Sequence, residues 1–183
     1  MQKRNEVIFA GLGGMGVLLS GELLTRSAAK QYKHALWLPN YTTSQRGAPC
    51  NCIVIISDEE IYSPLIDQTD VVVVMSPSEL STFGKRAKPG GIIIAESFGL
   101  AEKSDRDDIT FVEMPAIQTA MKRGSMMGSN LVAFGFLLAI SSMVSLENAR
   151  ESIEEKFSGK KAALTNNMEL FEEGLDLGRN ALA

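Results

Sequence analysis

The chain has 183 residues, of which 45% are hydrophobic and 22% are charged, and its formal net charge is -4. This length and composition are those of one globular domain, so we expect residues 1–183 to form a single domain with a normal core. A negative net charge argues against a nucleic-acid-binding protein, which normally carries a basic face. The two cysteines, Cys50 and Cys52, and the one histidine, His34, are too few for an iron–sulfur cluster or a closed zinc site.

The first elements expected are a strand, a glycine turn and a helix. Val7–Ala10 is a short apolar run that favours a buried strand, and the apolar spacing after it predicts a helix from about Gly14 to Lys30. Between them, Gly11-Leu12-Gly13-Gly14-Met15-Gly16 has its glycines at the G-x-G-x-x-G spacing. Bare backbone N–H groups at a helix start favour an anion or a nucleotide-type ligand, and the alternative is a packing turn that binds nothing.

The middle of the chain alternates strands with loops. We expect strands at 36–38, 50–56, 71–75, 92–95 and 109–112. The β-branched run Val71–Met75 has no polar alternation, which is typical of a strand covered on both faces in a parallel sheet. Ser76 and Pro77 then favour a helix start with a serine N-cap, Pro89-Gly90-Gly91 interrupts the chain before the next strand, and the charged segment 96–108 is expected to be exposed.

The last third of the chain is expected to be helical, with helices at about 115–123, 129–144, 146–157 and 160–180. The apolar run Leu131–Leu146 is shorter than the ~20 residues that a membrane span needs, so it predicts a buried core helix. Alternating strands and helices predict an α/β fold, a Rossmann-like three-layer sandwich with a largely parallel sheet. The glycine loop, the 41–48 loop and the Ser76 turn should then lie at one edge of that sheet.

The features of a complete enzyme are missing from the sequence. A nicotinamide-binding domain carries an acid about 20 residues beyond the glycines, but here the second strand ends in Leu38-Pro39-Asn40. There is no G-x-S-x-G elbow and no Walker lysine, and no catalytic residue or metal ligand is predicted. Arg46 lies on the polar 41–48 loop, where it is a candidate to bind a phosphate or carboxylate; a salt bridge to a partner chain is the alternative. The pattern suggests a phosphate-cradling subunit.

Several motifs in order carry a resemblance to a known family. They are Gly11–Val17 with Gly21–Leu24, then Trp37–Tyr41, Arg46-Gly47, Asn51-Cys52, Ile56–Pro64 and Asn130–Gly135. Together they resemble the gamma subunit, or gamma domain, of 2-oxoacid:ferredoxin oxidoreductases of the 2-oxoglutarate or ketoacid type. The resemblance covers nearly the whole chain.

The resemblance implies a subunit of a complex that oxidatively decarboxylates a 2-oxoacid with coenzyme A, giving an acyl-CoA and reduced ferredoxin. Thiamine diphosphate and the Fe-S clusters would lie on partner subunits, ferredoxin would act through the complex, and this chain alone would be inactive. The gamma part helps to bind coenzyme A. The residues implied for that site are Gly11, Leu12, Gly13, Gly14, Met15, Gly16, Ser44, Gln45 and Arg46.

The chain departs from the family pattern at three places. Met15 stands where a glutamine is common, Ala48 replaces the second glycine after Arg46, and Gln45 stands where the 2-oxoglutarate type often has methionine. A 2-oxoglutarate-like acid remains the favoured substrate. The alternatives are the small subunit of an indolepyruvate-type ferredoxin oxidoreductase, a free-standing NAD-dependent Rossmann dehydrogenase and an adaptor that binds no ligand. No signal peptide precedes the first strand, so we expect a cytoplasmic hetero-oligomer without membrane attachment.

Overall fold

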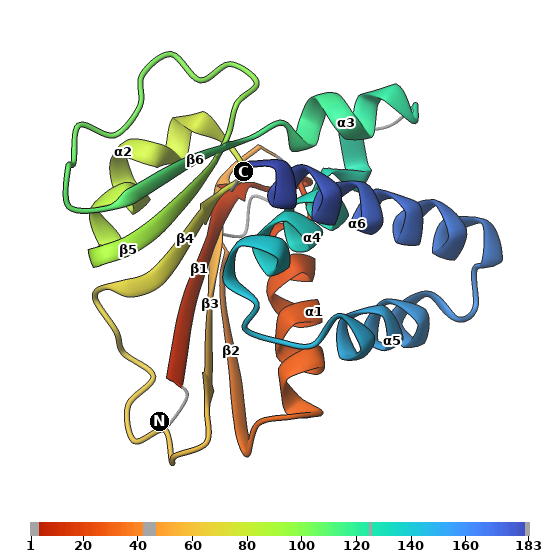
Figure 1. Ribbon diagram of the computed structural model, residues 1–183, viewed down its shortest axis with the longest axis horizontal. Coiled ribbons are helices and arrows are strands. Elements are labelled where there is room, and N and C mark those ends of the chain that lie inside the picture. Colours follow the sequence, from red (N-terminus) through yellow and green to blue (C-terminus); the bar gives the residue numbers. More distant parts are fainter. Residues whose placement is uncertain (1–3, 42–46, 125, 182–183) are drawn as a thin grey trace.

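The computed structural model describes residues 4–41, 47–124 and 126–181. Six strands of this part form one sheet in the order β2-β3-β1-β4-β5-β6 (Figure 1). The strands β1, β4, β5 and β6 are parallel to one another, whereas β3 is antiparallel to both of its neighbours, β1 and β2. The largely parallel sheet is therefore confirmed. The strands are β1 (Arg4–Leu12), β2 (His34–Tyr41), β3 (Pro49–Ser57), β4 (Thr69–Val74), β5 (Ala87–Glu96) and β6 (Thr110–Met114).

Helices cover both faces of the sheet. In Figure 1, α1, α4, α5 and α6 lie on one side, and the short α2 lies on the other side, over β4 and β5. The three layers and the helical last third are thus confirmed. The helices are α1 (Val17–Ala29), α2 (Leu80–Phe83), α3 (Ala116–Lys122), α4 (Ser129–Ser141), α5 (Leu146–Phe157) and α6 (Lys161–Ala181), with the 3-10 turns η1 (Pro77–Glu79), η2 (Gly84–Arg86) and η3 (Met126–Gly128).

The core follows from strand alternation. Val7 and Phe9 of β1 point to the face covered by α1 and α4, while Ile8 and Ala10 point to the face covered by α2. All four valines of 71–74 are buried, two on each face, which explains the unbroken β-branched run in the sequence.

The buried helix α4 packs backbone to backbone against α6. A Cβ placed on Gly174 of α6 would lie 2.9 Å from the Cα and the carbonyl carbon of Val132, and closer still to its oxygen. A Cβ on Gly178 would lie 2.8 Å from the carbonyl oxygen of Phe136. The predicted core helix is therefore confirmed. None of the described helices combines the length and apolarity that crossing a bilayer requires.

Three local expectations differ from the structure. Helix α1 begins at Val17 instead of Gly14, because Gly14 (φ 96°) and Gly16 (φ 77°) have left-handed backbone that a right-handed helix cannot include. The Pro89–Gly91 segment lies inside β5, where the register with β4 shifts in a bulge, and does not precede the strand. The Ser76 side chain does not cap a helix; its hydroxyl lies 3.0 Å from the hydroxyl of Ser78.

Candidate functional site

The glycine loop connects the carboxyl end of β1 to the first helix. A Cβ placed on Gly11 would lie 2.9 Å from Cγ2 of Val17 and 3.2 Å from Cβ of Met75, so a side chain here would push α1 and the end of β4 away from β1. The Met15 N–H donates to the Leu12 carbonyl at 3.2 Å and closes the turn. The absence of side chains thus sets how closely the helix approaches the sheet.

Hydrogen bonds bring three segments to one edge of the sheet. The Gly13 N–H donates to the Ala48 carbonyl at 2.8 Å, and the Gly47 N–H donates back to the Gly13 carbonyl at 3.2 Å. The Met75 N–H donates to the Ala10 carbonyl at 2.7 Å, which places the Ser76 turn beside the loop. The predicted meeting of these segments is confirmed for the described residues. Ser44, Gln45 and Arg46 lie outside them, so their part in the site stays a prediction.

Helix α1 starts without a side-chain cap. Its N-cap residue is Gly16, and the first helical bond runs from the Ser20 N–H to the Gly16 carbonyl at 3.0 Å. The first N–H groups of a helix have no intrahelical partner. Among the hydrogen bonds between described residues, none takes the N–H of Gly16, Val17 or Leu18. Together with the helix dipole, these donors make the start of α1 suited to an anionic group.

The antiparallel direction of β3 is consistent with the absence of an acidic residue that could bind a ribose. In a nicotinamide-binding domain, the acid follows a strand that runs parallel to β1 and lies next to it. Here β3 occupies that place and begins at this edge, with Cys50 opposite Gly11 and Asn51 opposite Ala10. Residues 48–51 contain no carboxylate. The geometry therefore argues against the NAD alternative.

The two cysteines are free thiols in the interior. Burial raises the pKa of Cys50, and the nearby Glu79 carboxylate raises it further. Burial raises the pKa of Cys52 to about 12, and its Sγ lies 3.6 Å from the Val17 carbonyl oxygen. Since a thiolate and not a thiol is the nucleophile, neither side chain is activated for chemistry.

Glu96 was expected to be exposed with the charged segment that follows it, and that expectation is wrong. It is 1% exposed at the end of β5, where its carboxylate accepts hydrogen bonds from the N–H groups of Phe98 (2.9 Å) and Ile117 (3.0 Å). Burial raises its pKa, although the backbone donors oppose that effect. The carboxylate holds the start of α3 against the sheet, so Glu96 has a structural role.

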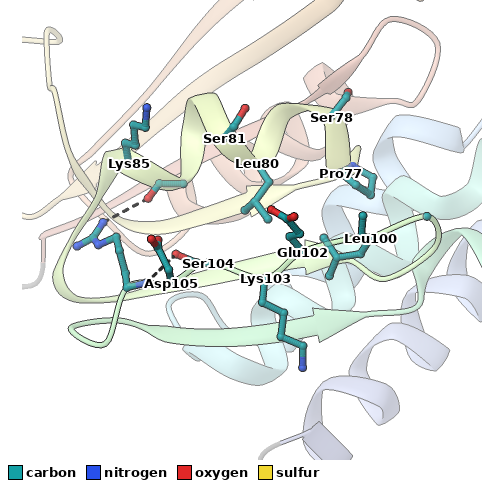
Figure 2. A pocket seen from close by; sticks show the side chains of 14 residues that line it. Pro77, Ser78, Leu80, Ser81, Lys85, Leu100, Glu102, Lys103, Ser104 and Asp105 are labelled. Atoms are coloured by element: carbon teal, nitrogen blue, oxygen red, sulfur yellow. Dashed lines mark hydrogen bonds between the residues drawn. The ribbon is translucent and has the colours of Figure 1, made fainter.

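A separate cavity of about 700 Å³ lies between the η1–α2–η2 segment and residues 99–106 (Figure 2). In Figure 2, Leu80 and Glu102 extend toward each other across it, whereas Lys103 extends away. The lining residues are Pro77, Ser78, Leu80, Ser81, Gly84, Lys85, Gly99, Leu100, Ala101, Glu102, Lys103, Ser104, Asp105 and Arg106.

The charged residues that line this cavity are of both signs. The Lys103 amine pairs with Glu113 at 2.5 Å. The Arg106 guanidinium donates to the carbonyls of Gly84 and Ala87, at 3.3 and 2.7 Å, and pairs with Asp108. These two cations are held by other groups, while Lys85 and the acids Glu102 and Asp105 also line the space. The cavity thus carries side chains of both charges, whereas the start of α1 presents backbone N–H donors.

The fold and the site define an α/β protein in which a glycine loop joins the first strand to a helix without a side-chain cap. Among the described residues, neither cysteine is an activated nucleophile. The model of the family described as "Pyruvate ferredoxin/flavodoxin oxidoreductase" matches residues 6–177, and the chain belongs to this family. The family expected from the sequence motifs is therefore confirmed.

Named relatives are subunits of oxidoreductase complexes. "Ketoisovalerate oxidoreductase subunit VorA" of Methanothermobacter marburgensis is 32% identical over 177 residues, which are 96% of this chain and 37% of that protein. This chain thus spans little more than a third of that relative. "2-oxoglutarate synthase subunit KorC" of the same organism is 32% identical over 95% of this chain and 96% of its own length.

Solved structures share the fold. The "keto/oxoacid ferredoxin oxidoreductase, gamma subunit" of Geobacter sulfurreducens matches with a TM-score of 0.86 at 24% identity, and the match covers 98% of each of the two chains. The "2-oxoglutarate:ferredoxin oxidoreductase from Magnetococcus marinus with 2-oxoglutarate, coenzyme A and succinyl-CoA bound" has a TM-score of 0.89 at 23% identity, over 98% of this chain and 32% of that one. The Rossmann-like α/β fold is thus that of gamma-subunit structures.

Proposed function

We propose that the chain is the gamma subunit of a cytoplasmic 2-oxoacid:ferredoxin oxidoreductase. In this complex a 2-oxoacid is oxidatively decarboxylated with coenzyme A, and the electrons pass to ferredoxin. Thiamine diphosphate and the Fe-S clusters belong to partner subunits. Family membership supports the proposal, and so does a relative of matching length named 2-oxoglutarate synthase subunit KorC, which favours 2-oxoglutarate as the acid.

Within the complex, the glycine loop contributes to the coenzyme A site. The observation that carries this assignment is the uncapped start of α1 at Gly16, beside the hydrogen-bonded pair formed by Gly13 and Ala48. The N–H groups there bind the diphosphate of coenzyme A, and Ser44, Gln45 and Arg46 extend the site from the adjoining connection. This chain binds and orients the carrier, and the bond-making steps take place on partner subunits.

Hydrogen–deuterium exchange on the assembled complex tests the site. Coenzyme A should slow exchange in the peptide that covers Gly11–Leu19, and pantetheine, which lacks the diphosphate, should not. NADH should leave the same peptide unchanged. If coenzyme A does not change the exchange rate of this peptide, or if NADH slows it, the assignment is contradicted.

Dye reduction tests the role as a subunit. The purified chain should not reduce methyl viologen with any 2-oxoacid, and the complex should do so only when coenzyme A is present. Comparing 2-oxoglutarate with pyruvate, ketoisovalerate and indolepyruvate in the complex then identifies the acid. Turnover by the chain alone would refute the proposal.

A further inference from the structure

Asn130 lies against the start of α1, although the two segments are far apart in the sequence. It is the second residue of α4, and it is 2% exposed. A Cβ placed on Gly16 would lie 2.7 Å from Cγ of Asn130 and 2.9 Å from its Nδ2. The carboxamide therefore occupies the space that a side chain on the N-cap residue of α1 would fill.

The backbone of Asn130 is anchored, but its side chain is not. The Ser20 hydroxyl of α1 donates to the Asn130 carbonyl oxygen at 3.3 Å, which fixes α4 to α1 at this point. Within the described part of the chain, the structure gives the Asn130 carboxamide no hydrogen-bond partner. Buried polar side chains normally have one, so this nearly buried amide is available to a bound partner.

The chemistry of the surroundings indicates what that partner is. Gly16, the N-cap residue of α1, supplies no side-chain cap, so the first backbone N–H groups of α1 and the amide NH₂ of Asn130 are the donors at this place. Such a set of neutral donors is complementary to an anionic oxygen.

We propose that Asn130 is a binding residue of the coenzyme A site, with its Nδ2–H donating to a diphosphate oxygen held at the start of α1. The inference rests on the proposed function, which it extends to a residue of α4. Asn130 positions the diphosphate at the first turn of α1 and takes no part in the chemical steps.

The test uses the assembled complex with three variants. Asn130→Asp has the same shape but opposes the diphosphate by its charge, and an acid in the first turn of a helix is compatible with folding. Asn130→Ser removes the NH₂ donor without adding charge. The matched control is Asn148→Asp, which makes the same change in the first turn of α5. Asn148 donates to Gln31 beyond the far end of α1, about 20 Å from Gly16 along a 13-residue helix.

We expect Asn130→Asp to raise the KM for coenzyme A by about tenfold or more, and Asn130→Ser to raise it several-fold. The kcat at saturating coenzyme A and the KM for the 2-oxoacid should change less than about twofold, as should every parameter of Asn148→Asp. A purely structural role for Asn130 would instead lower kcat or the amount of assembled complex.

Two results separate the possible failures. If coenzyme A protects the Gly11–Leu19 peptide in the wild-type complex, but both Asn130 variants keep the wild-type KM, the role of Asn130 is refuted and the proposed site stands. If coenzyme A does not protect this peptide in the wild-type complex, the proposed site fails, and the role of Asn130 fails with it.

Discussion

The contact between α4 and α6 predicts that adding one methyl group at Gly174 destabilises the fold. In an exposed helix the change Gly174→Ala would stabilise by about 1 kcal/mol, because alanine has the higher helix propensity. Here the new Cβ would lie 2.9 Å from two backbone carbons of Val132. The backbone cannot rotate away as a side chain would, so the helices must move apart, and overpacking of this kind costs about 1–3 kcal/mol. Because the clash is with backbone atoms, we expect a cost in the upper part of this range, about 2–3 kcal/mol, and hence a net loss of about 1–2 kcal/mol after the propensity gain.

Urea and thermal unfolding followed by circular dichroism measure this loss. A chain of this size should lose about 2–8 °C in Tm. The matched control is Gly159→Ala, since a Cβ on Gly159 meets no atom within 4 Å. That variant should keep the wild-type stability or gain up to about 1 kcal/mol from a less flexible unfolded state. A Gly174→Ala variant that is as stable as the wild type would refute the reasoning about the helix contact.

The remaining predictions concern buried charge and thiol chemistry. Because burial raises the pKa of Cys52 to about 12, the folded chain should resist iodoacetamide at Cys52 near pH 8, and urea should expose it; peptide mass spectrometry that finds native labelling at the unfolded rate contradicts this. The unfolded thiol ionises at lower pH than the folded one. This residue's contribution to stability is therefore complete below about pH 9, where an unfolded thiol ionises, and is lost as the pH rises toward 12, by at most about 1.4 kcal/mol per pH unit. Cys52→Ala should reduce the fall in stability over this pH range in urea titrations, and the part that Cys50 and Tyr32 contribute should remain. The Lys88 amine pairs with the largely buried Glu6 at 2.6 Å and with Asp70 at 2.8 Å, so Lys88→Met should cost about 1–2 kcal/mol in urea. Lys30→Met should have a smaller effect, because the Lys30 partners Glu151 and Glu155 are exposed. Equal losses for the two lysines would argue against the buried network.

The layers of the fold and the edge that carries the site are predictable from local patterns. The valine run 71–74 has the composition of a doubly covered strand, and the glycine spacing at 11–16 marks a turn between a strand and a helix. These signals depend on neighbouring residues only. They therefore agree with the structure to within a few residues at most helix ends.

Features that depend on distant contacts were out of reach. Periodicity identifies 50–56 as a strand but carries no information on its direction, so the reversal of β3 is learned only from its pairing with β1. The partner of Gly16 is Asn130, which lies more than a hundred residues later in the chain. In the sequence, Glu96 is the first acid of a charged segment and is therefore predicted to be exposed. In the structure, the N–H groups of Phe98 and Ile117 donate to its carboxylate and so stabilise it in the interior.

The central position of β1 has a consequence for how the chain folds during its synthesis. Val7 of β1 pairs with Val54 on one side and Val71 on the other. Because β1 is synthesised before both of these neighbours, its apolar residues stay exposed until β4 has been made. Contacts of such long sequence separation slow folding and expose the nascent chain to aggregation. Among the strands of this sheet, β1 is thus the one to which a chaperone would have the longest time to bind.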